Sequence, residues 1–553
     1  MKMDAKWLLV FVTIICINYL QTSRALIKDQ QSTTSQPNFI ILFMDDIGWG
    51  DLGANWNPSG NSDTPFMDAL AKKGMRFTDF HSGASICTPS RAALLTGRLG
   101  KRTGVIRNFG KKSTGGLPLN ETTMAETLQA GGYRTGMIGK WHLGMTKPFQ
   151  PYRRGFEYFY GLPWSNDMGC VDKPGQDIPH CAPCAQDPHG ILSNEIWSEG
   201  IFKNYSYNKQ GSEQLGCDPQ LALPLFENDT ILHQPVNLQT LSNNYAEKAQ
   251  AFIKNSKNKT DSRPFLLYIA FAHMHVPLIY MENFTNSSKS RGVYGDTLHE
   301  LDNTVQRIYK AVQDAGVEEN TLIWATGDNG PWEVKCQLSG DPGPFIGGWQ
   351  KQNGGGSTSK LTVWEGGHRE PSFAYWLNHI KPGSVSDSIL SAMDIYPTLA
   401  SLAGIALPSD REYDGIDISG VLLNGEEIKQ RVLFHPNSKP ADRENNGEFD
   451  AIRYNQYKAI YRSGGVKGCG GVRGDIQRHN PPLIFNLLTD PGEEHPLDSQ
   501  SNEYQDAYTH IKLARMRMDW SIFQDNTTAA DYSQSPDAEP CCNPNHVVCR
   551  CTL

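Results

Sequence analysis

The chain has 553 residues, of which 39% are hydrophobic, 10% aromatic and 20% charged. This composition can fill a large core, and it excludes a wholly disordered chain. The formal net charge is −8, which argues against a broad nucleic-acid surface because such surfaces are basic. An anionic ligand would therefore need positive charge that is concentrated in one pocket.

The N-terminus predicts a signal peptide. Lys2 and Lys6 precede an apolar run over residues 7–20, and small residues at Ser23 and Ala25 suit signal peptidase. We expect cleavage after Ala25. The run is short for a membrane span of about 20 residues, so a signal anchor that stays attached is the less favoured alternative. No second long apolar run follows, which predicts a mature chain without a transmembrane anchor.

Beyond residues 26–37, which we expect to be disordered, apolar runs alternate with amphipathic segments. Three of the apolar runs predict buried strands, and polar residues follow each of them. The alternation predicts an α/β fold, with a mostly parallel sheet between helices; ligands of such sheets bind beyond the carboxyl ends of the strands. The expected strands are 38–44, 264–271 and 321–326, a further apolar stretch is 371–377, and the expected helices are 64–73, 124–130, 295–315 and 388–403.

The pattern changes after about residue 430. Short β-like runs separated by Gly, Asn and Pro predict a smaller antiparallel unit, with a helix over residues 503–518 and a cysteine-rich tail. The segment 155–235 is rich in Pro, Asn, Gly and Cys, and we expect a long insertion near the site. The expected strands of the small unit are 432–435, 450–453, 457–462 and 483–488, and the predicted division is a signal peptide over 1–25, a large domain over 26–430 and the C-terminal unit over 431–553.

The use of cysteine fits an oxidising compartment. Of twelve cysteines, Cys16 leaves with the signal peptide and Cys87 belongs to the motif described below. Eight of the other ten cysteines fall into two groups of four, which are given at the end of this paragraph. If the cysteines pair inside these groups, Cys336 and Cys469 are left to form a long-range bridge, although sequence does not fix connectivity. Zinc binding through cysteines is the less favoured alternative. The two groups are Cys170, Cys181, Cys184 and Cys217, and Cys541, Cys542, Cys549 and Cys551.

Seven N-x-S/T triplets agree with passage through the secretory pathway. Single triplets arise by chance, but seven of them together with a signal peptide predict a glycoprotein. The expected acceptors are Asn120, Asn204, Asn228, Asn258, Asn283, Asn286 and Asn526.

The sharpest motif is Cys87-Thr88-Pro89-Ser90-Arg91, which continues to Thr96-Gly97. It resembles the sulfatase signature C-x-P-S-R-x-x-x-x-T-G. In that family the cysteine is oxidised in the endoplasmic reticulum to Cα-formylglycine. The resemblance therefore implies that Cys87 is modified and that a formylglycine-generating enzyme is a partner during maturation.

Further segments match the same family in order along the chain. The resemblance covers residues 38 to about 500 and is closest to the animal arylsulfatases, the group of arylsulfatase A and N-acetylgalactosamine-6-sulfatase. It implies an alkaline-phosphatase-like sandwich in which residues 26–430 form the catalytic sulfatase domain. The matching segments are Asp45-Asp46, Gly132–His142 (which resembles G-Y-x-T-x-x-x-G-K-W-H), His273–Pro277, Gly327–Gly330, Lys360 before Trp364–Gly367, and Leu488–Glu493.

The chemistry of a sulfate monoester explains why an aldehyde would replace a thiol. The hydrated aldehyde offers two hydroxyls on one carbon. One hydroxyl attacks sulfur and forms a sulfated intermediate, and the other, once deprotonated, expels sulfate as the aldehyde forms again. No water molecule then has to attack sulfur.

A hard divalent cation suits the oxygen side chains at two strand ends. Asp45, Asp46, Asp328 and Asn329, together with an oxygen of the modified Cys87 and a sulfate oxygen, make a Ca²⁺ shell of roughly six or seven ligands. Mg²⁺ is the weaker alternative, because it prefers near-octahedral geometry with several waters.

The resemblance also implies roles for the cationic residues, which meet the negative charge that develops on the sulfate oxygens. Cys87, as formylglycine, is the nucleophile, and Arg91 and Lys140 hold its hydroxyls. His142 accepts the proton of the second hydroxyl during release. The remaining roles are sulfate contact by His275, Lys360 and Ser165, protonation of the leaving oxygen by His275, and acceptance of the proton of the attacking hydroxyl by Asp328; His273 is expected to be structural.

Two other functions remain as alternatives. One is a phosphate or phosphonate ester hydrolase of the same superfamily, although such phosphatases typically use Ser or Thr nucleophiles. The other is a secreted matrix or glycan-binding protein that keeps the fold. The predicted substrate is an aryl sulfate or a sulfated glycan, with stacking on Trp164, Trp332, Trp349 or Trp364 as one option. Lysosomal and extracellular fates both fit the sequence, and the oligomeric state is open, a homo-oligomer included.

Overall fold

The structure, a computed structural model, describes residues 36–169, 171, 221–255, 261–436 and 447–542. Contacts divide the chain into two units, Met1–Gln36 and Pro37–Leu553, and every element named below belongs to the second. The predicted signal peptide and the expected disorder over residues 26–35 lie outside the described residues. Within those ranges, no helix combines the length and the apolar character that a membrane crossing requires.

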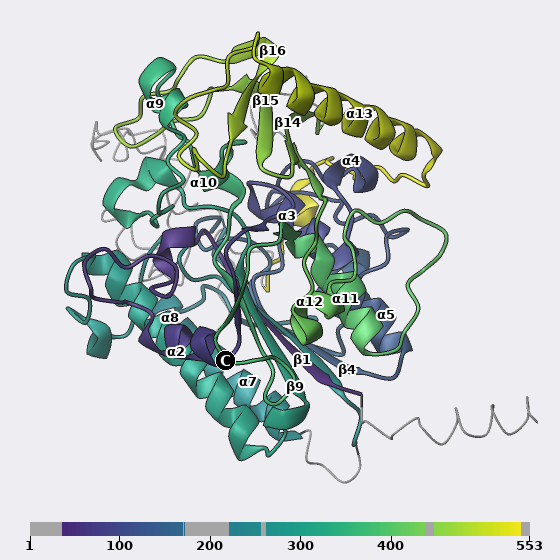
Figure 1. Ribbon diagram of the computed structural model, residues 1–553. Helices are drawn as coiled ribbons and strands as arrows, with labels where there is room; N and C mark the ends of the chain where they lie inside the picture. Colours follow the sequence, from purple (N-terminus) through teal and green to yellow (C-terminus); the bar gives the residue numbers. More distant parts are fainter. Residues whose placement is uncertain (1–35, 170, 172–220, 256–260, 437–446, 543–553) are drawn as a thin grey trace, which may run out of the picture. The chain divides into compact units, whose positions relative to one another are not determined.

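Ten strands form one sheet in the order β11-β2-β10-β9-β1-β8-β4-β5-β6-β7. Its centre is parallel, because β1 pairs in parallel with β8 and β9, and β4 does so with β8 and β5. Figure 1 shows β1, β4 and β9 running together between the helices. The strand bounds are β11 Ser384–Ser386, β2 Met75–Phe77, β10 Ser372–Tyr375, β9 Thr321–Gly327, β1 Asn38–Met44, β8 Phe265–Phe271, β4 Arg134–Gly139, β5 Tyr158–Gly161, β6 Leu225–Glu227 and β7 Thr230–His233.

The central strands are apolar throughout because both faces of the sheet are covered. Every residue of β1, β8 and β9 is buried, as continuous apolar runs in parallel sheets predict. The predicted strands over 38–44, 264–271 and 321–326 are therefore confirmed. The apolar stretch 371–377 contains β10, which pairs antiparallel to β9. The segment 155–235 is not only an insertion, because β5, β6 and β7 extend the large sheet.

Helices cover both faces of this sheet. In Figure 1, α2, α7 and α8 lie together on one side, while α3, α5, α11 and α12 lie on the other. In α8, the buried residues Leu298, Leu301, Val305 and Ile308 recur every third or fourth position, which is the spacing of an amphipathic helix. The helix bounds are α2 Pro65–Lys73, α3 Cys87–Thr96, α4 Gly100–Thr103, α5 Met124–Ala130, α7 Leu241–Lys254, α8 Gly292–Asp314, α9 Gly348–Asn353, α10 Glu365–His368, α11 Ile395–Leu402, α12 Ser419–Asn424 and α13 Asn502–Gln524.

The predicted helix over 388–403 is wrong in its first half. Leu390 and Ser391 form a short strand, β12, which pairs with β3 (Phe80–His81). The Ser391 hydroxyl then accepts a hydrogen bond from the amide of Met393 and caps a 3-10 turn, so the α-helix begins only at Ile395. Serine competes for backbone hydrogen bonds in this way at helix starts.

A second, four-stranded antiparallel sheet follows, as predicted for the C-terminal unit. Its order is β13-β14-β15-β16, and α13 packs on it through Tyr504, Ala507 and Ile511 (Figure 1). The helix is six residues longer at its end than the predicted 503–518. The strand bounds are β13 Val432–Pro436, β14 Phe449–Tyr454, β15 Tyr457–Ser463 and β16 Gln477–Asn486.

The predicted long-range bridge is confirmed, because Cys336 and Cys469 form a disulfide. The local pairing inside the two groups stays a prediction. Cys541 and Cys542 are also disulfide-bonded, which contradicts the zinc alternative for these two residues. The remaining cysteines of the two predicted groups, Cys170, Cys181, Cys184, Cys217, Cys549 and Cys551, lie outside the described residues.

Five predicted glycosylation acceptors lie in the described ranges. The side chain of Asn228 is half-buried, and its carbonyl oxygen accepts a hydrogen bond from the amide of Phe159. The acceptors Asn204 and Asn258 lie outside the described residues. The exposed ones are Asn120, Asn283, Asn286 and Asn526. Glycosylation itself stays a prediction.

Candidate active site

Four neighbouring strands of the large sheet deliver polar side chains to one place. They are adjacent in the order β9, β1, β8 and β4 and all run in the same direction, so their carboxyl ends meet at one edge. Three of these strand ends were predicted from their sequence alone. The side chains supplied are Asp328 and Asn329 after β9, Asp45 and Asp46 after β1, His273 and His275 after β8, and Lys140 and His142 after β4.

Cys87, the first residue of α3, also lies at this edge of the sheet. All ten residues of α3 are buried, and Cys87 is a free cysteine. Its Sγ lies 3.7 Å from Asp45 Oδ1 and 3.5 Å from Lys360 Nζ. Arg91 is one turn further along the helix and therefore on the same face. The N-terminus of a helix also adds a partial positive charge at this position.

Three carboxylates and three cations alternate around Cys87. All six side chains are buried, and buried charges are stable only when they are paired in this way. The pairs are Lys140 with Asp45 (Nζ to Oδ2, 2.6 Å), Arg91 with Asp328 (Nη2 to Oδ2, 2.8 Å) and Lys360 with Asp46 (Nζ to Oδ1, 2.5 Å).

This charge pattern sets the protonation of the site. Burial opposes ionisation of Asp45, but Lys140 and Arg91 outweigh it, and its pKa is well below the ordinary range. Burial and repulsion from Asp45 raise the pKa of Asp328 to about 7. Burial raises the pKa of the Cys87 thiol to about 12, even though Lys140 and Lys360 oppose the shift. Unmodified Cys87 would thus be a protonated thiol and a poor nucleophile at neutral pH.

Two buried oxygens of the cluster fit a cation. In the part of the chain that the structure describes, neither Asp46 Oδ2 nor Asn329 Oδ1 accepts a hydrogen bond. Unsatisfied buried oxygens are costly, and a bound cation would satisfy both. Ligand atoms of Asp45, Cys87 and Asp328, and those of Asp46, Cys87 and His275, lie within 4.8 Å of one another. The donor set is mainly carboxylate and amide oxygen, which hard divalent cations prefer.

His142 has one ring nitrogen free. Its Nε2 lies 3.2 Å from the carbonyl oxygen of Phe109, and because a carbonyl only accepts, Nε2 carries the hydrogen. Nδ1 is buried and has no hydrogen-bond partner among the described residues. Burial and the neighbouring Lys140 and Arg91 lower the pKa of His142 well below its ordinary value. The ring is therefore neutral, with Nδ1 available as a base.

His275, Lys360 and Trp332 form the opposite side of the site. His275 Nδ1 lies 2.7 Å from the carbonyl oxygen of Val276, so Nε2 is the nitrogen near Asp46, at 3.6 Å from Oδ2. The ring of Trp332 is half-buried and packs against His275 with centroids 5.4 Å apart. Lys360 Nζ lies 4.8 Å from the centre of the same indole. Among the four tryptophans considered from sequence, Trp332 thus contacts two predicted sulfate-binding residues.

Ser165 lies in the segment after β5, beside His275. The side chain of the next residue, Asn166, donates hydrogen bonds to the carbonyls of Ala272 (3.1 Å) and His275 (3.4 Å). Ser165 is buried. His273 Nε2 lies 3.8 Å from Glu300 Oε2, and the structural role expected for His273 stays a prediction.

The backbone is strained at the site. Asp46 (φ 55°), His142 (φ 62°), Met274 (φ 73°) and Leu361 (φ 74°) all adopt left-handed conformations, which non-glycine residues rarely adopt. Two of them are predicted site residues, and the other two directly adjoin His275 and Lys360. Such strain persists only where the surrounding structure holds it, and it concentrates at functional sites.

Three supporting residues were not predicted from sequence. Thr88 Oγ1 donates to the carbonyl of His142 (2.8 Å), and the Thr88 amide donates to Asn108 Oδ1 (3.0 Å). Phe109 supplies the carbonyl that fixes the tautomer of His142. Thr88 lies inside the signature and could have been considered. Asn108 and Phe109 act through contacts with residues 20 and 33 positions away, which no local pattern indicates.

The comparisons with known proteins agree with this site. The family model described as Sulfatase matches residues 37–405, and the model described as C-terminal region of aryl-sulfatase matches residues 429–551. The chain is 48% identical to arylsulfatase G of Homo sapiens over 519 residues, which cover 93% of each chain. It is 36% identical to arylsulfatase A of Homo sapiens, over 92% of this chain and 93% of that one.

Solved structures share the fold. The crystal structure of the PsFucS1 sulfatase from Pseudoalteromonas sp. aligns with a TM-score of 0.73 and 27% identity, and covers 92% of this chain and 94% of that one. The phosphonate monoester hydrolase of Agrobacterium radiobacter aligns with a TM-score of 0.53 at 17% identity, which is a likeness of fold alone.

Proposed function

This chain belongs to the sulfatase family and is a sulfuric ester hydrolase, and from that premise we propose that its nucleophile is a formylglycine made from Cys87 and that its cation is Ca²⁺. The observation that carries the proposal is the environment of Cys87. A buried, protonated thiol stands at a helix N-terminus among three cations and three carboxylates. As a thiol it has no nucleophilic role there, whereas a hydrated aldehyde would supply two hydroxyls, one for attack on sulfur and one for release of sulfate.

Arg91 and Lys140 hold the charge around the nucleophile. Arg91 is fixed twice, through Asp328 and through the carbonyl of Lys140 (3.0 Å). Neighbouring carboxylates raise the pKa of both Arg91 and Lys140 despite their burial, so both stay cationic. Prearranged cations of this kind stabilise the charge that develops on oxygen in the transition state.

Two groups accept protons in this proposal. Asp328, with a pKa raised to about 7, takes the proton of the attacking hydroxyl. His142 takes the proton of the second hydroxyl at Nδ1, because Nε2 is committed to the carbonyl of Phe109. A neutral imidazole with one fixed tautomer is suited to this step.

His275, Lys360 and Ser165 bind the substrate. Lys360 Nζ already lies 3.5 Å from Cys87 Sγ, at hydrogen-bonding reach of an oxyanion formed beside the nucleophile. His275 protonates the leaving oxygen from Nε2, since Nδ1 donates to a backbone carbonyl. Trp332 packs on His275 and Lys360 and offers an apolar face to the organic part of the ester. We therefore propose a sulfated sugar or aryl group as the substrate.

Asp45, Asp46, Asp328 and Asn329 would hold the cation. It would supply a Lewis acid for a sulfate oxygen. The mainly oxygen donor set suits Ca²⁺, which accepts a more variable coordination geometry than Mg²⁺ does.

The proposal includes the secretory pathway as the place of maturation, with a formylglycine-generating enzyme as partner and a lysosomal or extracellular destination. The signal peptide, the seven glycosylation triplets and the disulfide bond support it. The net charge of −8 argues against nucleic acid as a partner.

The test combines mass spectrometry with turnover. The tryptic peptide that ends at Arg91 should be about 18 Da lighter than the cysteine form, and the same preparation should hydrolyse a chromogenic aryl sulfate much faster than the matching phosphate ester. Protein from cells that lack the modifying enzyme serves as the control. An unmodified peptide in a fully active preparation would refute the formylglycine. Faster phosphate hydrolysis would favour the phosphatase alternative.

A further inference from the structure

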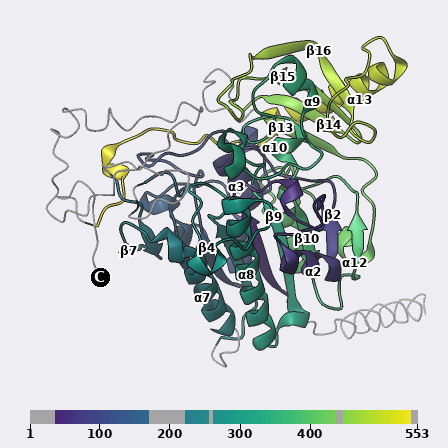
Figure 2. The same ribbon diagram turned by 90° about the vertical axis from the view of Figure 1, so that its left-hand side faces the viewer.

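The chain after α13 returns to the catalytic domain and runs along the loop that supports the active site. We call residues 525–542 the C-terminal tail and residues 98–115 the support loop. The support loop follows α3 and carries Asn108 and Phe109, which hold Thr88 and His142. Figure 2 shows the tail in yellow, reaching toward the β7 edge of the large sheet; there Gln234 donates to the carbonyl of Pro540.

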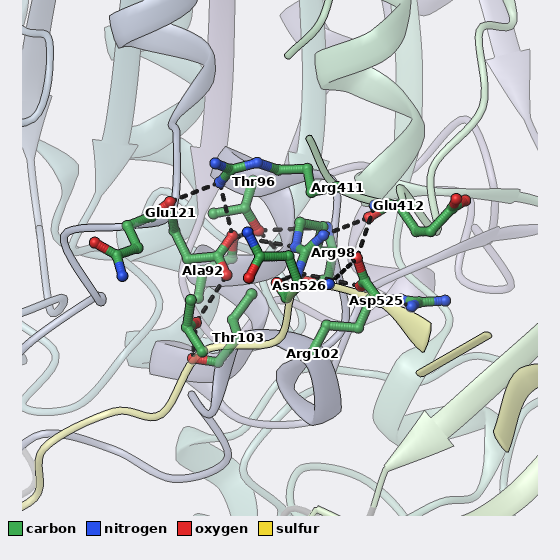
Figure 3. A network of polar contacts seen from close by, with 12 residues as sticks. Ala92, Thr96, Arg98, Arg102, Thr103, Glu121, Arg411, Glu412, Asp525 and Asn526 are labelled. Atoms are coloured by element: carbon green, nitrogen blue, oxygen red, sulfur yellow. Dashed lines mark hydrogen bonds and ion pairs between the residues drawn. The ribbon is translucent and has the colours of Figure 1, made fainter. Parts of the chain in front are cut away.

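The start of the tail is fixed by two arginines of the support loop. Arg98 is fully buried, and its Nη2 lies 3.3 Å from Asp525 Oδ2 and donates to the carbonyl of Asn526 (3.0 Å). Arg102 Nη1 donates to Asp525 Oδ2 (2.8 Å). Figure 3 shows both guanidinium groups converging on Asp525, with Glu121 on the far side of Arg98. Buried ion pairs with this geometry hold a segment in one position.

Tyr532 is the centre of the contact. Its hydroxyl accepts hydrogen bonds from the amides of Ile106 (2.8 Å) and Arg107 (3.1 Å) and lies 3.2 Å from the carbonyl of Gly104. Its ring stacks on Phe109, with centroids 5.0 Å apart and an interplanar angle of 24°. Tyr532 therefore holds both the backbone that precedes Phe109 and the ring of Phe109 itself.

Glycines of the support loop leave room for the tail backbone. A Cβ on Gly104 would lie 2.5 Å from the amide nitrogen of Ala530, and one on Gly115 would lie 2.2 Å from the carbonyl oxygen of Asp531. Real side chains do not fit at these distances. The two segments are thus built to touch along their backbones.

The last part of the tail stays beside the support loop. The amide of Ser535 donates to the carbonyl of Lys112 (2.9 Å) and continues the pairing of the two segments. Three residues later, Ala538 lines a small cavity, about the size of one water molecule, together with Phe109 and His142. Cys541 and Cys542 at the end of the tail are both disulfide-bonded.

We propose that the C-terminal tail supports the active site and that Tyr532 is a positioning residue for His142. Tyr532 acts through Phe109, whose carbonyl selects the tautomer that leaves His142 Nδ1 free. The proposal rests on the proposed sulfatase function, since His142 has its catalytic role only there.

The test of this proposal replaces Tyr532 with Phe, which keeps the stacked ring and removes the hydroxyl. We expect kcat for a chromogenic aryl sulfate to fall about tenfold with KM nearly unchanged, because small displacements of a catalytic group are costly. Hydrogen exchange at the amides of Ile106 and Arg107 should become faster. The control is Tyr508→Phe, since Tyr508 is a half-buried tyrosine on α13 away from the support loop, and it should change neither quantity.

The outcomes separate this proposal from the sulfatase function. If the wild-type enzyme is active and Tyr532→Phe has an unchanged kcat, the positioning role is overturned, even if hydrogen exchange becomes faster. A wild-type chain without turnover of the aryl sulfate would count against the proposed function instead. Unaltered exchange at Ile106 and Arg107 in Tyr532→Phe would then overturn the bracing of the support loop without any activity measurement.

Discussion

Two of the buried clusters of alternating charge in the described residues differ in how completely their oxygens are paired. The active-site cluster joins Asp45, Asp46 and Asp328 to Arg91, Lys140 and Lys360. A second cluster, which we call the junction cluster, fastens the C-terminal sheet to the catalytic domain. It consists of Asp79, Glu365 and Glu493 with Arg369, Arg453 and Lys458.

The two clusters differ in whether their buried oxygens have close polar partners. In the junction cluster, Lys458 Nζ lies 2.9 Å from both Glu365 Oε1 and Glu493 Oε1, and Arg453 pairs with Asp79 at 2.7 Å. In the active-site cluster, by contrast, Asp46 Oδ2 lies 3.6 Å from His275 Nε2, and neither this oxygen nor Asn329 Oδ1 accepts a hydrogen bond among the described residues. Left-handed backbone occurs in both clusters, at Asp46 and His142 and also at Glu493 (φ 52°), so backbone strain does not separate them. A cluster whose carboxylate oxygens face cations at short distances holds two parts together, whereas oxygens without close partners can bind a ligand.

Residue types alone would not separate these clusters. Asp79, His81 and Glu365 lie close enough to hold a metal ion by distance. However, Arg369 and Arg453 already pair with the same carboxylates. The active-site carboxylates pair with cationic side chains as well, so what favours the proposed metal site at the strand ends is the presence of two oxygens without hydrogen bonds among the described residues, Asp46 Oδ2 and Asn329 Oδ1.

The largest expected effect comes from removing the nucleophile. Cys87→Ala should lower aryl sulfate turnover by at least about a thousandfold, because the covalent route is lost. The melting temperature should change little, since Cys87 is small and buried. Turnover and thermal unfolding measure the two quantities. Near-normal turnover by Cys87→Ala would contradict the assignment, and Cys87→Ser is the isosteric comparison.

Lys458→Met should affect stability more than any single change in the active-site cluster. It leaves Glu365 and Glu493 without their shared cation, and breaking a buried pair costs about 3–5 kcal/mol. Lys360→Met should lower turnover but cost less stability in metal-loaded protein, because the cation still compensates Asp46. Denaturant unfolding of both variants checks this, and equal losses of stability would remove the distinction between the clusters.

Asp328→Asn should lower turnover about a hundredfold and release the metal, because one ligand charge is lost. Elemental analysis of the purified variant measures the metal directly. Asp302→Asn is the control; Asp302 is a buried carboxylate on α8 that accepts the amides of Phe66 and Met67, and this variant should keep its metal. Full turnover by metal-free protein would argue against the site.

The smallest effect is a pH dependence at the edge of the junction cluster. His435 packs on His368 and His81, with ring centroids 4.1 and 5.4 Å away. Burial, with repulsion from His368 and Lys458, lowers the pKa of His435 well below its ordinary value. Below about pH 6.5 the unfolded chain therefore binds a proton that the folded chain does not. The free energy of unfolding then decreases as the pH is lowered, by up to about 1.4 kcal/mol per pH unit.

His435→Gln should reduce that loss of stability between pH 6.5 and 5 relative to the wild type. Denaturant unfolding at a series of pH values gives the comparison, with constant ionic strength. An identical slope in the variant would show that His435 does not contribute to the acid sensitivity.

Much of the fold could be predicted because the central strands have a clear sequence pattern. Continuous apolar runs such as 38–44 and 321–326 are long, bounded by polar residues and insensitive to context. The helix predicted over 388–403 failed at its start because Ser391 offers a competing hydrogen bond to the backbone. Short strands such as β2 and β11 have three residues each and carry too little pattern to be recognised.

The sequence by itself indicated the family, the proposed nucleophile and most of the charged residues of the proposed site, because these lie inside contiguous motifs. Only the tertiary structure decided which carboxylates face which cations and which ring nitrogen of His142 has no partner among the described residues. It alone also brought Tyr532 back to a loop more than 400 positions earlier in the chain. The physical reason is that parallel strand ends and a returning tail meet in space through packing, and packing leaves no local trace in the residues that it joins.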